Sequence, residues 1–106
     1  MYAFQFERAA DAKSAVARLK ADGDAKFLAG GQSLLAAMKL RLAAPSMLVD
    51  VARIPGMADI RVEGDALVIG GAARHADVAA NAEIRRRIPS LAVLANGIGD
   101  RQVRAM

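Results

Sequence analysis

Apolar residues in the first half of the chain follow two alternating spacings, and each spacing predicts one kind of secondary structure. Short runs in which apolar residues alternate or lie together predict strands over residues 2–6, 25–29 and 47–51. Between these runs, apolar residues recur three or four positions apart, which predicts helices over residues 9–21 and 33–42. This alternation of strands and helices with short connections favours a small parallel sheet.

Helix-ending residues follow both predicted helices. Gly23 stands where a helix commonly turns into the left-handed conformation, so we expect it to end the first helix. Pro45 cannot continue a helix, so we expect it to end the second.

The second half of the chain begins with a hairpin signal and continues with helices. Two apolar runs, Ile60–Glu63 and Ala66–Ile69, flank the pair Gly64-Asp65, which is typical of a two-residue turn. Helices are predicted over residues 75–80, 81–87 and 89–97. For the last four residues, the sequence predicts neither a cap nor a terminal helix nor a strand.

The change from parallel to antiparallel character near residue 55 indicates a boundary between two lobes. We therefore predict an α+β fold in which residues 1–55 form a small parallel βαβαβ lobe. Residues 56–106 are predicted to be the beginning of a second, mainly antiparallel α+β lobe that is incomplete.

The junction between the second predicted strand and its helix carries the main candidate site. Gly30 and Gly31 end an apolar run, and Ser33, a favourable N-cap residue, begins the helical pattern. Glycine permits positive φ and close approach of a ligand, so several N–H groups can point at one phosphate or diphosphate. The same spacing also describes an ordinary tight turn, and it matches neither the Rossmann nor the P-loop glycine motif.

Composition excludes several classes of protein. The 106 residues include no cysteine and one histidine, so this chain has no thiolate ligands for an iron–sulfur cluster, no disulfide and no metal site. No apolar run approaches the roughly 20 residues of a membrane helix, and the N-terminus lacks the pattern of a signal peptide. We therefore expect a cytoplasmic protein without a transmembrane segment.

The net charge of +4 is concentrated near the end of the chain, since the residues after position 80 include five arginines and only two acidic residues. A basic tail can bind nucleic acid. These arginines lack interleaved aromatic residues, however, and Arg85–Arg87 fits the solvated face of a short helix. We expect no nucleic-acid binding, and favour a partner-subunit surface or plain solvation.

A longer string around the two glycines resembles a known family. The string consists of residues 29–35, Ala-Gly-Gly-Gln-Ser-Leu-Leu, and residues 38–42, Met-Lys-Leu-Arg-Leu. It resembles the first FAD-binding segment in the flavin (medium) subunit of molybdenum hydroxylases, the family of the carbon monoxide dehydrogenase and xanthine dehydrogenase type. Further matching segments follow in the expected order at residues 48–51, 54–56, 71–77, 88–91 and 98–104. The resemblance covers essentially the whole chain and implies a truncated PCMH-type FAD-binding fold.

The resemblance also implies a cofactor and its ligands. FAD is expected to be bound non-covalently by Ala29, Gly30, Gly31, Gln32 and Ser33, with weaker candidates at Leu34, Asp100, Arg101 and Gln102. No residue is expected to be catalytic. A second motif of the form Thr-x-Gly-Gly, which completes the flavin site in the family, is missing here. The chain is therefore expected to be an N-terminal fragment that is inactive alone.

The implied function is electron transfer within a larger oxidoreductase. In such a complex, a large subunit holds the molybdenum cofactor and a small subunit holds the 2Fe-2S clusters. The flavin subunit accepts electrons from those clusters and passes them to an external acceptor. The alternative function is a non-catalytic βαβ module that binds a partner chain or a simple anion.

Three further polar residues are candidates for a role. His75 is the one histidine and Asp77 lies two residues on, but no nucleophile accompanies them, so we interpret both as helix-capping residues that hold a loop. Asp50 ends the third predicted strand, and we interpret it as a turn or cap residue.

Overall fold

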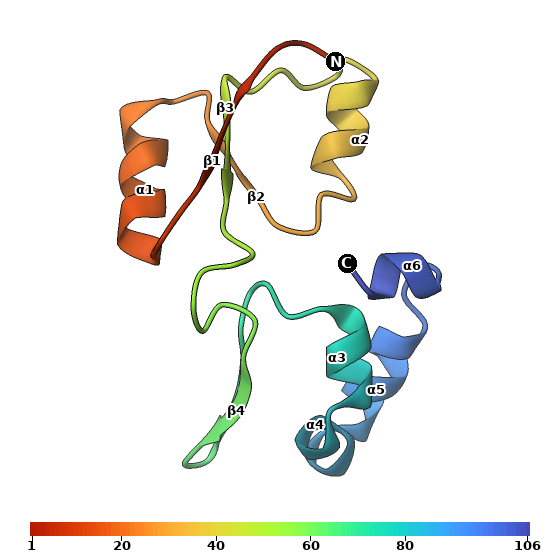
Figure 1. The fold of residues 1–106 in the computed structure, drawn as a ribbon. Helices are drawn as coiled ribbons and strands as arrows, with labels where there is room; N and C mark the ends of the chain where they lie inside the picture. The colour runs from red at the N-terminus through yellow and green to blue at the C-terminus, as the bar shows by residue number, and fades with distance from the viewer. The chain divides into compact units, whose positions relative to one another are not determined.

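The computed structural model describes residues 1–106 and divides them into two compact units, Met1–Pro55 and Gly56–Met106 (Figure 1). The first contains a three-stranded parallel sheet, and the second contains an antiparallel strand pair followed by helices. The predicted α+β fold class is therefore confirmed.

The first unit is a βαβαβ arrangement with its last strand in the middle. Its elements in chain order are β1 (Gln5–Arg8), α1 (Ala12–Ala21), β2 (Lys26–Leu28), α2 (Leu34–Lys39) and β3 (Met47–Asp50). The sheet order is β1-β3-β2, all parallel, and α1 and α2 lie on opposite sides of it (Figure 1). Leu48 and Val49 of β3 are 1% and 0% exposed, because a central strand is flanked by strands and covered by helices.

Strand β1 lies further along the chain than predicted. Its pairing runs from Gln5 opposite Met47 to Arg8 opposite Asp50, and the Ala9 N–H extends it by donating to the Asp50 carbonyl at 3.1 Å. The aromatic alternation over residues 2–6 therefore does not set the strand boundaries. The position of β3 sets them, because a strand exists only where a neighbour pairs with it.

The Asp11 side chain caps the start of helix α1, and Asp22 is the C-cap residue at its end. Asp11 accepts the Ser14 N–H at 2.7 Å and forms a capping box with that serine, so the helix begins at Ala12 rather than at residue 9. At the other end, the Asp22 carboxylate accepts the Asp24 N–H at 3.0 Å and the Ser46 hydroxyl at 2.6 Å. The helix ends at Ala21 as predicted and Gly23 follows the C-cap residue Asp22, but Gly23 does not take the left-handed conformation.

Helix α2 ends in a Schellman motif built on an arginine. The Leu42 N–H donates to the Ala37 carbonyl at 2.8 Å, and the Arg41 N–H donates to the Met38 carbonyl at 3.0 Å. Arg41 has φ 58°, the position where glycine is usual, and its guanidinium lies 5.0 Å from the centroid of the Tyr2 ring. The helix therefore stops at Lys39, before the predicted end.

The second unit opens with the predicted hairpin. Strand β4 (Ile60–Glu63) pairs antiparallel with β5 (Ala66–Ile69), and Glu63 lies opposite Ala66 across the turn. Gly64 has φ 56°, as a two-residue turn of this kind requires.

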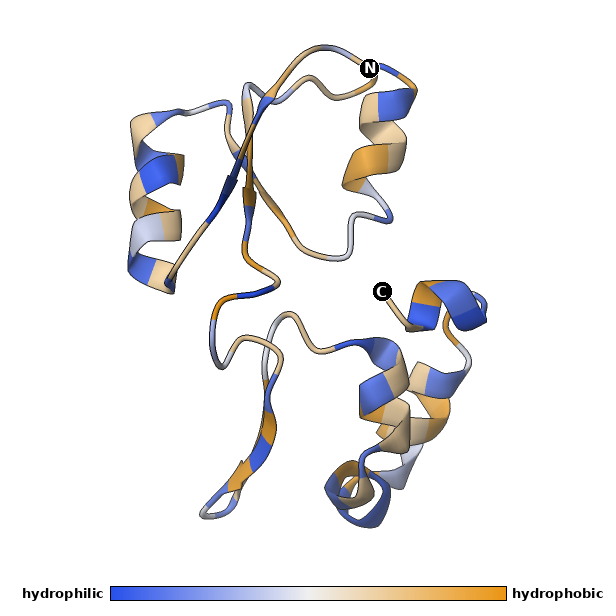
Figure 2. Cartoon of the chain, viewed as in Figure 1, coloured by the Kyte–Doolittle hydropathy of each residue, from blue (hydrophilic) through white to orange (hydrophobic).

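Three short helices then pack into one apolar cluster. They are α3 (His75–Ala80), α4 (Ala82–Arg87) and α5 (Pro89–Asn96), which contribute Val78, Ile84, Ala92 and Ala95 to the buried cluster. Asn81 caps α4 by accepting the Ile84 N–H at 3.1 Å. Figure 2 shows that α4 is mostly hydrophilic, so Ile84 is the residue that anchors it to the cluster.

A fourth helix, α6 (Arg101–Arg104), follows, so the prediction of no terminal helix and no cap is wrong. The Asp100 carboxylate accepts the Val103 N–H at 2.8 Å and thereby begins the turn. A single helical turn is too short to show a repeating apolar spacing. The sequence feature that could have predicted this helix is Asp100, a favourable N-cap residue.

Close backbone contact fixes the hairpin to the loop that precedes it. The Gly70 N–H donates to the Asp59 carbonyl at 2.7 Å, and the Ala72 N–H donates to the Met57 carbonyl at 2.9 Å. A Cβ on Gly70 would lie 2.1 Å from the Met57 carbonyl oxygen. Only glycine therefore allows this approach.

Candidate functional site

Residues Ala29, Gly30, Gly31, Gln32 and Ser33 form the loop between β2 and α2, referred to below as the glycine loop. Leu28 is in register with Asp50, and Asp50 is in register with Arg8, so the three parallel strands end at one edge of the sheet. The glycine loop follows Leu28 directly at this edge. Ligands of open α/β sheets bind outside the carboxyl ends of the strands, so the loop occupies a favourable position.

Gly31 sets the shape of the loop. Its φ of 79° confirms the prediction that one of the two glycines adopts the left-handed conformation. A Cβ at this position would lie 2.8 Å from Leu35 Cδ1 and 3.6 Å from Leu28 Cδ1, so the space beside the backbone is already filled by leucine. A side chain at position 31 is disfavoured both by its backbone conformation and by these contacts.

Helical hydrogen bonding extends back to Gly31, although α2 begins at Leu34 with Ser33 at the N-cap position. The Gly31 carbonyl accepts the Leu35 N–H at 3.1 Å, and Ser33 has helical dihedral angles of −94° and −49°. The Ser33 side chain makes no capping hydrogen bond, so the prediction of a serine N-cap is wrong in that respect. An N-cap needs an extended backbone to direct its side chain at the helix N–H groups, and Ser33 already lies in the first turn.

This arrangement gives the loop several hydrogen-bond donors. The N–H groups of Ser33 and Leu34 precede that of Leu35 in the first turn and have no partner within the helix. Ala29, Gly30, Gln32 and Ser33 are exposed, whereas Leu34 is half-buried. Backbone N–H groups and the Ser33 hydroxyl are thus presented at the surface, which is the donor set that suits a diphosphate.

Asp50 has a structural role at the same edge of the sheet. Its Oδ1 accepts the Ala52 N–H at 2.9 Å, and its Oδ2 lies 3.6 Å from Arg8 Nε. The side chain is only 13% exposed. The interpretation of Asp50 as a turn residue is confirmed.

The weaker candidates Asp100, Arg101 and Gln102 lie together in the second unit, at α6 and its cap. The Asp100 carboxylate is engaged in capping this helix. Arg101 lines a pocket with Arg104 and Asn96, two residues that the sequence did not single out. Arg101 and Arg104 are three residues apart, a spacing that places two side chains on the same face of a helix. This could have indicated a shared site, but no helix was predicted there.

His75 and Asp77 do not cap a helix through their side chains. His75 is the first residue of α3, Asp77 lies in its first turn, and the N-cap position belongs to Arg74 without a side-chain bond. Both residues are exposed. The capping interpretation is therefore wrong, although a carboxylate in the first turn of a helix is still favourable.

Two classes of feature are not found in this structure. No group of three or more histidine or acidic side chains is placed to hold a metal ion. The helices are all too short or too polar to cross a bilayer.

Comparison with family models matches residues 2–106 to the FAD binding domain in molybdopterin dehydrogenase. Among characterised proteins, the chain is similar to the carbon monoxide dehydrogenase medium chain of Hydrogenophaga pseudoflava, with 44% identity over 95% of this chain and 36% of that protein. It is also similar to the 6-hydroxypseudooxynicotine dehydrogenase complex subunit alpha of Paenarthrobacter nicotinovorans, with 41% identity over 90% of this chain and 33% of that protein.

Solved structures agree with the sequence comparison. Carbon monoxide dehydrogenase from Hydrogenophaga pseudoflava, in a form that lacks the Mo-pyranopterin moiety of its cofactor, matches with a TM-score of 0.95 and 42% identity. The match covers 98% of this chain and 37% of that one. The chain therefore spans about a third of the length of these relatives.

Proposed function

Because the chain belongs to the family of FAD-binding domains in molybdopterin dehydrogenases, we propose that its glycine loop binds the diphosphate of FAD. The observation that carries this proposal is Gly31, whose φ of 79° shapes the turn from β2 into α2, after which the Ser33 and Leu34 N–H groups have no partner within the helix. A diphosphate needs several converging donors, and the loop presents N–H groups rather than flexible side chains.

Each residue of the loop has a separate role in this proposal. Gly31 gives the loop its left-handed turn, Gly30 is exposed beside it, and the N–H groups near Ser33 donate to the diphosphate oxygens. The Ser33 hydroxyl is a further donor, because it is not engaged in capping α2. Ala29 and Gln32 complete the exposed stretch, while Leu34 contributes mainly to packing. Asp100, Arg101 and Gln102 are weaker candidates for contact with the cofactor.

The two units have different parts in this function. Residues 1–55 are the first flavin-binding subdomain, and residues 56–106 begin the second. Since the chain spans about a third of its relatives, the donors it offers are only part of a dinucleotide site. Loss of three or four hydrogen bonds weakens binding by on the order of a thousandfold. We therefore expect the 106-residue chain to bind FAD weakly by itself and to have no turnover.

FAD held by the glycine loop would supply the redox chemistry that carries electrons from iron–sulfur clusters on a partner chain to an external acceptor. These 106 residues include no cysteine, so they supply no thiolate ligand to such a cluster. The relative in Hydrogenophaga pseudoflava is the medium chain of a carbon monoxide dehydrogenase, and this supports a complex with a small iron–sulfur subunit and a large molybdenum subunit.

The test is an FAD titration of the complete subunit, followed by flavin fluorescence, for Gly31→Val against Gly23→Val. The first variant should weaken FAD binding by about a hundredfold or more, because two or more charge-assisted hydrogen bonds depend on the loop. Gly23 is the matched control, since it has ordinary φ and no atom within 4 Å of an added Cβ. Full FAD occupancy in Gly31→Val would show that the diphosphate binds elsewhere. A wild-type subunit without flavin affinity would favour the binding-module alternative.

A further inference from the structure

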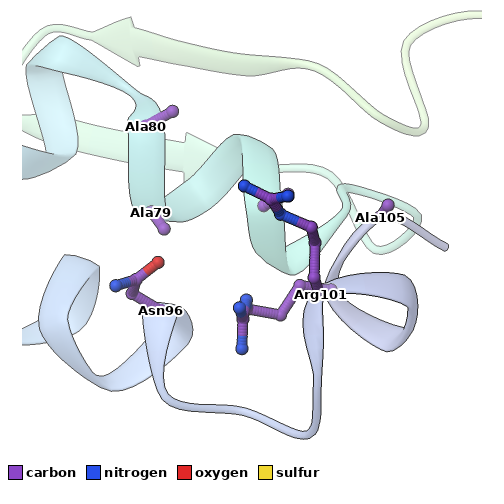
Figure 3. A pocket seen from close by; sticks show the side chains of 7 residues that line it. Ala79, Ala80, Asn96, Arg101 and Ala105 are labelled. Carbon is purple, nitrogen blue, oxygen red and sulfur yellow. The ribbon is translucent and has the colours of Figure 1, made fainter.

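A hollow of about 340 Å³ lies within the second unit, between α3, α5 and α6. Arg101 and Arg104 line it together with Asn96, and the rest of its wall is alanine, namely Ala76, Ala79, Ala80 and Ala105. Figure 3 shows the Asn96 amide facing α3 near Ala79, with the Arg101 side chain extending from α6. We name this hollow the arginine pocket.

The two arginines of this pocket are not neutralised by the protein. The five ion pairs of the structure involve Arg8, Arg18, Arg61, Arg86 and Arg87. Arg101 and Arg104 are in none of them. Arg104 donates one hydrogen bond, to the Ile98 carbonyl at 3.3 Å. No carboxylate lines the arginine pocket. Two guanidinium groups with most of their donors unused therefore meet at one concave surface.

A neighbouring hollow extends the positive charge. It has a volume of about 290 Å³, shares Ala79 and Asn96 with the arginine pocket, and is lined by Arg85. Arg86 and Arg87 donate to the Glu83 carboxylate at 2.6 and 2.8 Å, and their hydrogen bonds hold the pKa of Glu83 below its usual range. Of these three consecutive arginines, only Arg85 is left without an acidic partner and lines a hollow.

We propose that the arginine pocket binds the phosphate group of a small molecule, with Arg101 and Arg104 as its main donors and the Asn96 amide as a third. A planar guanidinium donates two parallel hydrogen bonds to an oxyanion, and two of them match a tetrahedral phosphate better than a planar carboxylate. The small alanine side chains leave room for the ligand but offer no aromatic ring for a base to stack on. Arg85 adds to the positive potential without contacting the same group.

This inference does not rest on the glycine loop, although Arg101 is also one of the weaker candidates for contact with FAD. The glycine loop lies in residues 1–55 and the arginine pocket in residues 56–106, and the two use different donors. Gly31→Val should therefore lose FAD and keep phosphate. Displacement of inorganic phosphate from the arginine pocket by FAD would overturn the inference and assign Arg101 to the flavin site.

The experiment is a titration of the purified protein with inorganic phosphate at constant ionic strength, followed by ¹H–¹⁵N NMR. Saturable shifts are expected at residues 96 and 101–105. The double variant Arg101→Gln with Arg104→Gln should weaken binding by about tenfold or more. Arg86→Gln is the matched control, because it removes the same type of charge from the same unit outside the arginine pocket. It should change the affinity by less than about twofold.

Other outcomes would overturn the proposal. Equal weakening in the double variant and in Arg86→Gln would mean that net charge alone attracts the anion. Tighter binding of acetate than of phosphate would assign the arginine pocket to carboxylates. If the double variant does not fold, Arg101→Gln alone serves, since Arg101 is exposed and makes no hydrogen bond through its side chain that would be lost. Unchanged phosphate affinity in that variant would exclude Arg101 as a ligand.

Discussion

The two anion sites proposed for this chain, one in each unit, use donors from different parts of the polypeptide. In residues 1–55 the donors are mainly backbone N–H groups, held in place by the left-handed conformation of Gly31. In residues 56–106 they are the guanidinium groups of Arg101 and Arg104. A backbone site depends on the shape of its loop, whereas a side-chain site depends on charge and is screened by salt. Changes in the shape of the loop should therefore weaken the backbone site, and added salt should weaken the side-chain site.

The largest effect is expected at the glycine where the second unit brings two backbone segments together. A Cβ on Gly70 would lie 2.1 Å from the Met57 carbonyl oxygen, and that backbone cannot swing aside as a side chain can. Gly70→Ala should lower the free energy of unfolding by about 3 kcal/mol or more, measured by chemical denaturation followed by circular dichroism. Gly31→Ala should cost only about 1–2 kcal/mol, because its Cβ would meet the flexible end of Leu35.

Gly71→Ala is the control for that prediction. A Cβ on Gly71 would meet nothing nearer than Met57 Sδ at 4.0 Å, so the change should be within about 0.5 kcal/mol of neutral. Equal losses at positions 70 and 71 would contradict the argument from close backbone contact.

Salt should separate the two anion sites. A tenfold rise in sodium chloride concentration should weaken phosphate binding to the arginine pocket by about threefold to tenfold, because exposed charges are screened over a Debye length of about 10 Å at 0.1 M salt. FAD binding through the N–H groups of the glycine loop should weaken by less than about twofold, since those donors carry no net charge. Calorimetric titration of the complete subunit measures both. The same salt dependence for both ligands would break the distinction.

Acid should destabilise the first unit through Asp22. Hydrogen bonds from the Ser46 hydroxyl and the Asp24 N–H favour the charged carboxylate and lower the pKa of Asp22. The unfolded chain then takes up this proton at higher pH than the folded chain does. The stabilisation is complete above the usual aspartate range and is lost as pH falls through the lowered pKa.

Urea denaturation between about pH 5 and pH 2 tests this expectation. Asp22→Asn should flatten the decline of stability with falling pH. Asp24→Asn should leave the decline unchanged, because the Asp24 side chain accepts no hydrogen bond, although its N–H donates one. A decline of the same steepness in Asp22→Asn and the wild type would count against a role for this carboxylate.

The smallest effect is expected at Arg41, the one non-glycine residue with positive φ. Arg41→Gly relieves a left-handed conformation that costs about 1–2 kcal/mol and loses a cation–π contact with Tyr2 worth about 0.5–1 kcal/mol. The net gain should be about 0.5–1 kcal/mol. Arg41→Ala keeps the conformational cost and loses the contact, so it should be less stable than the wild type. Thermal unfolding distinguishes the two, and a destabilised glycine variant would contradict the argument.

Local interactions explain which elements could be predicted. The hairpin over residues 60–69 was predicted with its observed bounds, because a glycine turn and flanking apolar runs are enough to specify it. Strand β1 was misplaced because its bounds depend on pairing with β3, about forty residues away. Helix α6 was missed because one turn has no apolar period, although Asp100 was in place to cap it.

The sequence by itself determined the order of the elements as far as α5, the fold class and the glycine loop with its family, because these depend on residues close together along the chain. Only the tertiary structure decided that β3 lies between β1 and β2, and that the helical turn after Gly31 leaves the Ser33 hydroxyl out of the cap. It also decided that Asn96, Arg101 and Arg104 share one hollow. These features depend on how distant segments pack, and packing is a property of the folded chain rather than of any local pattern.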